Sequence, residues 1–416
     1  MKTLWQQTLS FGPAARLLMF NQFAINLAFY MLMPYLAAHL ADGLGLAAWA
    51  VGLVLGVRNF SQQGMFLIGG TIADRFGHKA PIMAGCLLRT VGFGLLGWVD
   101  SLPALIAASA ATGFAGALFN PAVRAHLAQE AGDRHVDAFA TFNVYYQAGM
   151  LLGPLVGLAL LAADFRLVCT VAAAVFAVLT ALQAHALPAR GRTTTAPREP
   201  VLTQWRTVVT NRPFLLFSIA MIGAYVLTFQ VYLALPLAAA DALGGRGAWI
   251  TSGLFVVSAA VAVVGQLRLT AWAERRWSPA QALVRGLAVM GLAFLPLALT
   301  PPDAAVAVLA CLVAAVALLA AGSAVVYPLE MDTVVALSGN RLVATHYGLY
   351  NTVSGLGITL GNLATGALWD YAEDHAALRL VWFVLAATGL TCAVSVAALA
   401  RTGRLAVRTE PQLAAA

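Results

Sequence analysis

Apolar residues in this chain gather in long runs that short polar segments interrupt. Most runs hold about 20 residues or more, the length at which an α-helix crosses the hydrocarbon core of a bilayer. The pattern therefore predicts an all-α membrane protein with twelve transmembrane helices. Their predicted limits are 14–38, 48–73, 80–98, 103–127, 137–162, 166–187, 213–240, 248–272, 280–299, 304–328, 343–369 and 378–400.

One interruption differs from the others in length and composition. Residues 188–212 carry several arginines among threonines and prolines and show no apolar period. Such a segment is typical of a linker between two halves of a chain. We therefore expect an N-terminal six-helix bundle over 1–187, a basic cytoplasmic linker over 188–212, and a C-terminal six-helix bundle with a short cytoplasmic tail over 213–416.

Composition points to the same class of protein. Hydrophobic residues make up 61% of the 416 residues and charged residues only 10%, whereas a soluble domain carries about 25% charged residues. A surface this poor in charge excludes a soluble globular protein. The first run, 14–38, is too long for the core of a signal peptide, so we expect it to remain as the first helix.

The formal net charge of +7 comes from basic residues in short loops, which indicates membrane orientation rather than nucleic-acid binding. Lysines and arginines concentrate on the side of the N-terminus, and the opposite loops hold mainly aspartates. We therefore expect both termini in the cytoplasm and the chain in the inner membrane. The four cysteines lie inside apolar runs, so they are expected to be small core residues and not disulfides.

The turn between the second and third runs carries a charged motif. It reads G-x-x-x-D-R-x-G-x-K, with Gly70, Asp74, Arg75, Gly77 and Lys79 at the fixed positions. This pattern resembles the signature loop of the major facilitator superfamily of transporters. One interpretation is a solvated turn that only sets topology. The functional interpretation is a cytoplasmic gate, with Asp74 near the N-terminus of a neighbouring helix and Arg75 paired with an acid on a facing helix.

The fifth run carries Gly149, Gly153 and Gly157, with Pro154 between them. Glycines at this spacing share a helix face and let another helix pack closely, which is by itself ordinary helix packing. With the intervening proline, the run resembles the antiporter motif of the drug-efflux branch of the superfamily. The overall pattern, including residues 56–64, looks most like the MdtH-like multidrug branch and is also similar to siderophore exporters.

The resemblance implies two six-helix bundles, export by alternating access, and energy from a proton gradient with no cofactor. Efflux members often carry an arginine in the fourth span, four residues before a glycine. Here Ser109 precedes Gly113 at that spacing. The sequence therefore departs from the family at a position that the resemblance links to proton transfer.

Two arginines lie deep inside apolar runs. Arg58 is about ten residues from either end of the second run, roughly 15 Å deep at 1.5 Å per residue, and it shares one arc with Asn59 and Gln62. Arg89 lies midway along the third run. A charge at this depth costs roughly 2.5–3.5 kcal/mol and suggests a functional site. The alternative is a structural arginine bonded to carbonyls or amides of adjacent helices.

By this assignment no Asp or Glu lies at mid-membrane, so neither arginine has an obvious buried acid partner. We hypothesise a cationic cavity that takes anionic solutes, such as carboxylates, hydroxamates or catecholates. Other polar residues in the runs could line the same cavity, although hydrogen bonding between helices is the favoured explanation for each one taken alone. These candidates are Asn21, Asn26, Asn143, Gln147, Tyr225, Tyr350 and Asn351.

The energy source is constrained by what the sequence lacks. The chain has two lysines, and neither closes a G-x-x-x-x-G-K-[ST] phosphate loop, which excludes an ATPase of that type. The candidates for a proton carrier then lie at span ends: Asp137, Glu330, Asp332 and His126. The histidines are scattered and no H-E-x-x-H occurs, so we expect neither an enzyme nor a metal site.

The sequence therefore predicts a monomeric exporter of small drug-like or siderophore-like molecules, whose partners are its substrate and the lipid bilayer. An ion-coupled importer of a small anionic metabolite is the alternative within transport, and the motif of the fifth run argues against it. A non-transporting receptor or scaffold is the remaining alternative, because a fold alone does not fix function.

Overall fold

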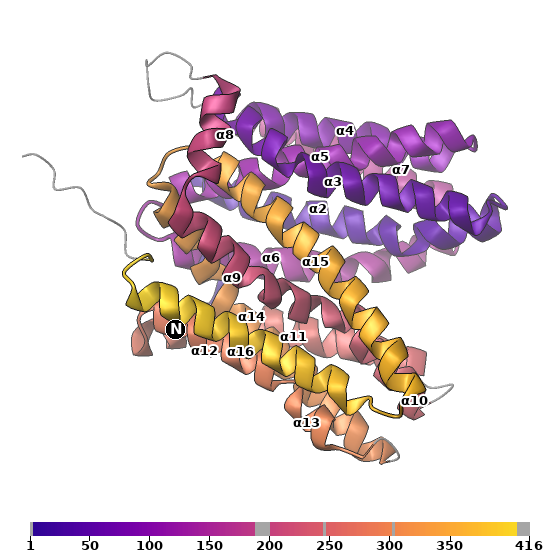
Figure 1. Ribbon diagram of the computed structural model, residues 1–416. Coiled ribbons are helices and arrows are strands. Elements are labelled where there is room, and N and C mark those ends of the chain that lie inside the picture. Colours follow the sequence, from indigo (N-terminus) through magenta and orange to yellow (C-terminus); the bar gives the residue numbers. More distant parts are fainter. Residues whose placement is uncertain (1–2, 188–199, 244–246, 302–303, 406–416) are drawn as a thin grey trace, which may run out of the picture.

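The computed structural model describes residues 3–187, 200–243, 247–301 and 304–405, and these residues form helices joined by turns (Figure 1). Ten helical segments are long and apolar enough to cross a membrane. Two further helices, α3 (Ala48–Phe76) and α15 (Val343–Asp374), are as long but more polar. The chain is thus an all-helical membrane protein.

The first set of helices covers the N-terminal part of the chain and packs together. After the short α1 (Leu4–Leu9), it comprises α2 (Pro13–Ala38), continued by a π-helical turn (His39–Gly43), then α3, α4 (Lys79–Trp98), α5 (Leu102–Ala131), α6 (His135–Leu161) and α7 (Phe165–Ala186). Within this set, α3 and α4 pack on α5, α6 packs on α2, and α7 packs on α4.

The second set follows α8 (Val201–Val209). It comprises α9 (Arg212–Phe229), a 3-10 turn (Gln230–Tyr232), α10 (Ala234–Leu243), α11 (Gly247–Arg276), α12 (Pro279–Leu292), α13 (Leu295–Leu299), α14 (Ala305–Ser338), α15 and α16 (Arg379–Arg401). Here α12 packs on α14 and α16, α11 packs on α14, and α9 packs on α15 and α16.

Every predicted run coincides with helix, but prolines divide two of them. The run 213–240 is broken at Gln230–Leu233, and the run 280–299 at Ala293–Phe294. Pro236 and Pro296 follow these breaks, and a proline cannot donate a hydrogen bond to the carbonyl four residues earlier. Apolarity alone did not reveal the breaks because proline does not interrupt a hydrophobic run.

The tenth run extends beyond its predicted end. Residue 328 is predicted to end it, yet α14 continues to Ser338 and stops at Gly339, which has a positive φ. The helix passes through Pro328, which leaves the carbonyl of Ala324 without its helical partner. Gln266 and Thr270 of α11 donate hydrogen bonds to that carbonyl at 2.6 and 2.9 Å. Glu330, expected beyond the end of this run, therefore lies within the continuous helix α14.

Part of the segment 188–212 also differs from the prediction of a non-periodic linker. Residues 201–209 form α8, whose Gln204 and Val208 are buried. Trp205 donates its indole N–H to Thr71 of α3 at 2.8 Å. Residues 188–199 lie outside the described residues. The linker thus includes a short helix that contacts both sets.

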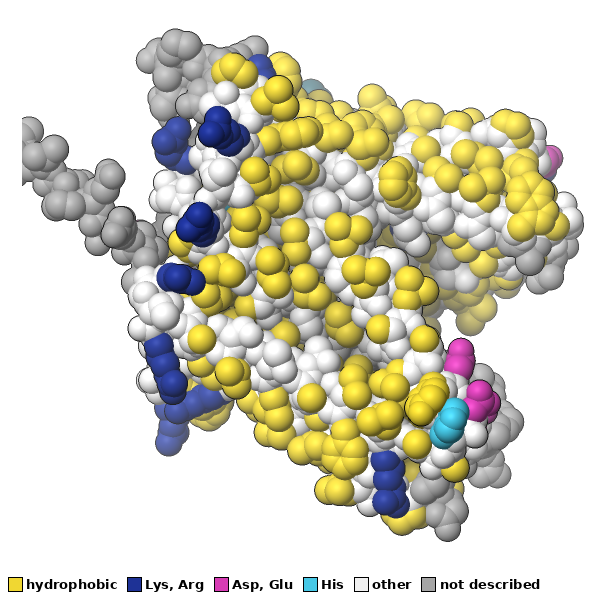
Figure 2. Space-filling view, in the orientation of Figure 1, with side chains coloured by type: hydrophobic (Ala, Val, Ile, Leu, Met, Phe, Trp, Pro, Cys, Tyr) yellow, Lys and Arg dark blue, Asp and Glu magenta, His cyan; other side chains and the backbone are white. Residues whose placement is uncertain are grey.

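The two sets meet at one end of the molecule and diverge at the other (Figure 1). Contacts between them join α3 to α15, α6 to α11 and α14, and α5 to α15. We call the end that carries α8 the α8 end, and the opposite one the far end. The far end of the first set and that of the second are separated by a recess (Figure 2).

Candidate functional site

A cavity of about 180 Å³ lies between the two sets of helices. Helices α2 to α6 of the first set and α9 and α15 of the second all contribute to its wall. Most of the lining side chains are polar or aromatic, and the two charged ones are arginines. The polar and charged lining residues are Gln22, Asn26, Tyr30, Gln62, Gln63, Arg89, Asn120, Arg124, Tyr146, Tyr225, Asn351 and Ser354.

Arg89 is a buried guanidinium in this wall, only 6% exposed. Its Cζ lies 5.1 Å from the ring centre of Phe29 and 5.4 Å from that of Phe176, so the cation is held against two aromatic faces. Among the described residues no side chain accepts a hydrogen bond from it, and its Nε is buried without a partner. Gly116 leaves the room that Arg89 and Gln62 occupy, because a Cβ there would lie 3.1 Å from both. Arg89 therefore keeps hydrogen-bonding capacity free at the cavity.

Arg58 lies outside this cavity. It is half-buried on α3, its Cζ lies 5.2 Å from the same Phe29 ring, and it donates a hydrogen bond to the neighbouring Asn59, which is exposed. The backbone of α3 at Arg58 packs directly against Gly113 of α5. Arg58 thus lies against the same Phe29 ring as Arg89, but it and Asn59 are on a more solvent-exposed part of α3. Gln62 lines the cavity.

Arg124 is the charged lining residue that the sequence analysis missed. It comes from α5 and interacts with the hydroxyl of Tyr327 on α14. One turn further along α14, Glu330 is 3% exposed and accepts hydrogen bonds from Tyr225 of α9 and, at 2.6 Å, from Tyr350 of α15. Four helices from both sets therefore join in one buried polar network, and its member Tyr225 also lines the cavity.

The motif at residues 70–79 joins the two sets at the α8 end. Asp74 accepts hydrogen bonds from the backbone N–H of Ala344 at 3.2 Å, and from the N–H and hydroxyl of Thr345 at 2.7 and 2.6 Å. These groups belong to the first turn of α15, where helix geometry and the dipole favour an anion. Asp74 thus lies at a neighbouring helix N-terminus, as the sequence analysis expects.

The other members of this motif have separate roles. Gly70 lies against the carbonyl of Ala344, Gly77 ends α3 with a φ of 83°, and Lys79 donates hydrogen bonds at 2.7 and 2.8 Å to the carbonyls of Ala184 and Leu187 at the end of α7. The expected pairing of Arg75 with an acid is wrong within the described part of the chain, where the charged groups of Arg75 and any Asp or Glu form no ion pair.

Next to this motif, two histidines contact each other. The Nδ1 atoms of His78, between α3 and α4, and of His126 on α5 are 3.3 Å apart. Burial lowers the pKa of His78 to about 4. The imidazole of His78 is therefore uncharged at neutral pH.

The glycines of α6 pack against the backbone of α2. Gly149, Gly153 and Gly157 face successive turns of α2 around Phe23, Leu27 and Met31, with no room for a Cβ. The carbonyl of Pro154 accepts a 2.7 Å hydrogen bond from Tyr35. The motif thus forms a close α2–α6 contact inside the first set of helices.

The remaining candidates fall into two groups. Asn26, Tyr225 and Asn351 line the cavity. Asn143 donates a 2.7 Å hydrogen bond to Gln266 of α11, which joins the two sets, and Asn21 is fully buried with its amide atoms unpaired among the described residues. Gln147 likewise has a buried oxygen that accepts no hydrogen bond from the described residues.

The four proton-carrier candidates lie in different surroundings. Asp137 binds Arg134 of its own helix terminus at 3.0 Å, and Asp332 binds His135 of the other set at 2.9 Å. His126 lies 4.0 Å from Glu130, beside His78. Glu330 is part of a network that reaches the cavity through Tyr225. Within the described ranges, no three His, Cys, Asp or Glu side chains are placed to hold a metal ion.

Comparisons with known proteins agree with this architecture. The family model for the Major Facilitator Superfamily matches residues 18–362. The chain is 54% identical over 395 residues to an uncharacterized MFS-type transporter of Mycobacterium tuberculosis, covering 94% of this chain and 93% of the relative. It is 31% identical over 375 residues to the multidrug resistance protein MdtH of Yersinia pestis, covering 90% of this chain and 91% of that protein. The chain belongs to the major facilitator superfamily of membrane transporters.

Proposed function

We propose that this protein exports small anionic molecules across the bacterial inner membrane by alternating access, in exchange for protons. The observation that carries the proposal is the cavity between the two sets of helices, whose charged lining residues, Arg89 and Arg124, are both cationic.

Twelve spans in two bundles of six are part of this proposal. The ten apolar helical segments together with α3 and α15 make twelve, and 29 or 32 residues of helix are long enough to cross a bilayer. Their polarity fits helices that line an interior path, because lipid would not tolerate it. Packing within residues 13–186 and within 212–401 supports the division into two halves.

The α8 end is proposed to face the cytoplasm. Basic residues lie along that edge of the molecule, and acidic residues are seen at the far end (Figure 2). Arginine and lysine in short loops mark the cytoplasmic side of bacterial membrane proteins. Under this orientation the described conformation is closed to the cytoplasm.

Opening toward the cytoplasm would require a defined set of contacts to break. These are the hydrogen bonds of Asp74 to the first turn of α15, the ion pair of His135 with Asp332, and the hydrogen bond of Asn143 to Gln266. All of them join residues of the two halves and are polar, so water can replace them when they separate. They are suitable as a reversible gate.

The anionic preference follows from electrostatics. No carboxylate lines the described cavity wall, and Glu330, which interacts electrostatically with Arg124, lies behind Tyr225. An anionic group that enters would gain charge-assisted hydrogen bonds from guanidinium groups that are already dehydrated. Carboxylates, hydroxamates and catecholates have this chemistry.

Glu330 is the proposed proton carrier. It is the one candidate both buried within a span and connected to the cavity, through Tyr225. Glu330 interacts electrostatically with Arg124, which lines the cavity and which an anionic substrate would also contact. Protonation of Glu330 and binding of an anionic substrate would thus both depend on the charge of Arg124. The two events would therefore be coupled, as exchange requires. Export is the proposed direction because one relative, MdtH of Yersinia pestis, is a multidrug resistance protein by name.

Transport by inside-out membrane vesicles tests the proposal. Vesicles with the protein, energised to hold a pH gradient, are offered hydroxamates, catecholates, carboxylates and quaternary amines. We expect accumulation of the anionic compounds that stops when a protonophore collapses the gradient. Accumulation of amines alone would contradict the anionic preference, and uptake by right-side-out vesicles would indicate an importer.

A further inference from the structure

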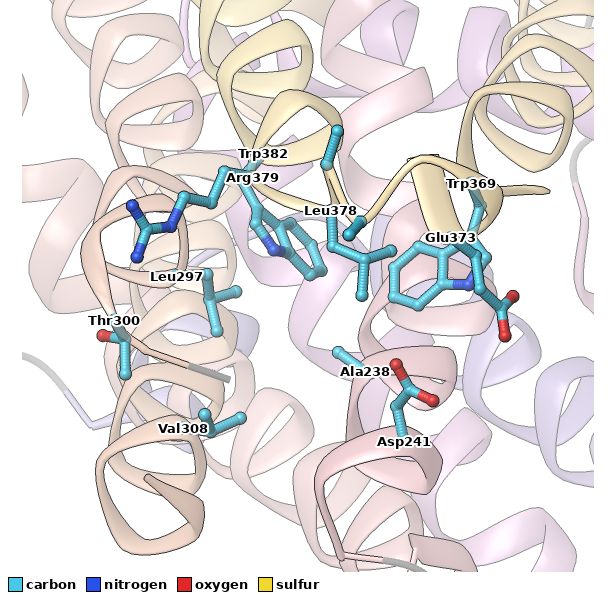
Figure 3. Close-up of a pocket in the computed structure, with 12 residues that line it drawn as sticks. Ala238, Asp241, Leu297, Thr300, Val308, Trp369, Glu373, Leu378, Arg379 and Trp382 are labelled. Carbon is cyan, nitrogen blue, oxygen red and sulfur yellow. The ribbon is translucent and has the colours of Figure 1, made fainter. Parts of the chain in front are cut away.

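A second, larger cavity lies at the far end of the second set of helices. Its volume is about 540 Å³, and its wall comes from α10, α13, α14, the end of α15 and the start of α16 (Figure 3). None of its lining residues belongs to the central cavity. Cavities of about 300–1,000 Å³ with mostly apolar walls and a few polar groups are typical small-molecule sites.

Two carboxylates lie on one side of this cavity. Asp241 of α10 and Glu373 of α15 point into the same region in Figure 3. Neither takes part in a hydrogen bond or an ion pair with other described residues. Two exposed negative charges therefore lie on one side of the cavity, with no ion-pair partner among the described residues.

Two tryptophans form the aromatic part of the wall. Trp369 and Trp382 are each only 5% exposed, with ring centres 5.8 Å apart at 84°. Trp382 also stacks on Phe294, which fixes its orientation. Both rings line the cavity. The cavity thus offers rigid aromatic surface beside the carboxylates.

Arg379, the basic residue among the described lining residues, lies apart from the acids. Figure 3 shows the guanidinium of Arg379 on the opposite side of the cavity, beyond Trp382. The apolar side chains of Leu297, Val308 and Leu378 form the part of the wall between these polar groups. Arg379 therefore leaves the negative side of the cavity open to a ligand.

We propose that this cavity binds an organic cation with an apolar body. The cationic centre would lie between Asp241 and Glu373 and contact the aromatic rings, which attract cations through their negative faces. The apolar body would contact Leu297, Val308 and Leu378. The site is chemically the opposite of the central cavity, whose charged lining residues are arginines.

Binding of tetraphenylphosphonium tests this site, with tetraphenylborate as a control of nearly the same shape and opposite charge. Equilibrium dialysis is performed on the full chain in phosphatidylcholine nanodiscs. After subtraction of the partition into empty nanodiscs, we expect saturable binding of the phosphonium with about one site per chain, and no borate binding that depends on Asp241 and Glu373. The double variant Asp241→Asn, Glu373→Gln should weaken binding at least tenfold, and Arg379→Gln should leave it unchanged or tighter.

Two further variants separate this site from its alternatives. Asp374→Asn removes the same charge one residue from Glu373 but outside the cavity wall, and Arg89→Gln alters only the central cavity. Both should bind tetraphenylphosphonium within twofold of the unmodified protein. The proposal is overturned if the double variant binds as tightly as the unmodified protein, or if Asp374→Asn loses as much affinity, which would indicate attraction to surface charge only.

Discussion

The carboxylate of Asp74 and residue Thr345, which lie 271 positions apart, are joined by two hydrogen bonds of 2.7 and 2.6 Å. One comes from the backbone N–H of Thr345 and the other from its hydroxyl. The pairing fixes the end of α3 to the start of α15 and closes the α8 end between the two halves of the chain.

Asp74→Asn should open this end. An amide offers one acceptor oxygen instead of two and turns an N–H₂ group toward backbone donors, and a hydrogen bond to a charged group contributes about 1.5–3 kcal/mol. We expect the closed conformation to lose at least tenfold in population relative to the open one. Distances between spin labels at the exposed positions 133 and 276, one in each half, measure this, and an unchanged distance distribution would refute it.

Gly70→Ala should have a related effect for a steric reason. A Cβ at Gly70 would overlap the carbonyl of Ala344, so α3 and α15 could no longer pack closely. Gly64→Ala is the matched control on the same helix, because its Cβ would meet only the Phe60 ring at 3.9 Å. We expect transport to fall at least tenfold in the first variant and stay within twofold in the second. Equal activity of the two would contradict the role of this contact.

Glu330→Gln should uncouple transport from protons. Glutamine keeps the size and can still accept from Tyr225 and Tyr350, but it cannot exchange a proton. We expect uphill transport to fall at least tenfold, while exchange of substrate for substrate across the membrane persists. Glu274→Gln, at an exposed acid of α11, serves as the control. If the Glu330 variant still accumulates substrate in response to a pH gradient, another residue carries the proton.

The pKa of His78 predicts how stability depends on pH. Burial lowers it to about 4, below the ordinary value of about 6.5, so folding favours the neutral form. This contribution is complete above about pH 6.5 and is lost as the pH falls toward 4. The drop in Tm between pH 7.5 and 5 should therefore be smaller in His78→Gln than in the unmodified protein. The exposed His185→Gln should show the same drop as the unmodified protein.

The helices could be predicted from the sequence because bilayer thickness sets the length of apolar runs. What could not be predicted depends on tertiary hydrogen bonds. Glu330 and Asp332 suggest the end of a span, yet α14 continues because tyrosines from α9 and α15 satisfy the first and His135 satisfies the second. Apolarity also gave no sign that residues 201–209 form a helix docked on α3.

In the candidate site, too, some features could be predicted from the sequence and others could not. Asp74 follows a local sequence pattern, so its place at the N-terminus of a neighbouring helix could be expected. Arg89 could be found because it lies midway along an apolar run. The association of Arg124 with Tyr327 and Glu330 joins residues about 200 positions apart, and no spacing in the sequence indicates it.

Transport kinetics of Arg89 variants test the central claim most directly. Arg89→Gln and Arg89→Lys are compared for one anionic substrate and for its uncharged ester. If the cavity recognises anions, Arg89→Gln should raise the KM for the anion at least tenfold, about 1.4 kcal/mol, Arg89→Lys should restore part of it, and the ester should be unaffected. Equal changes for the anion and its ester, or none for either, would contradict a cationic export cavity.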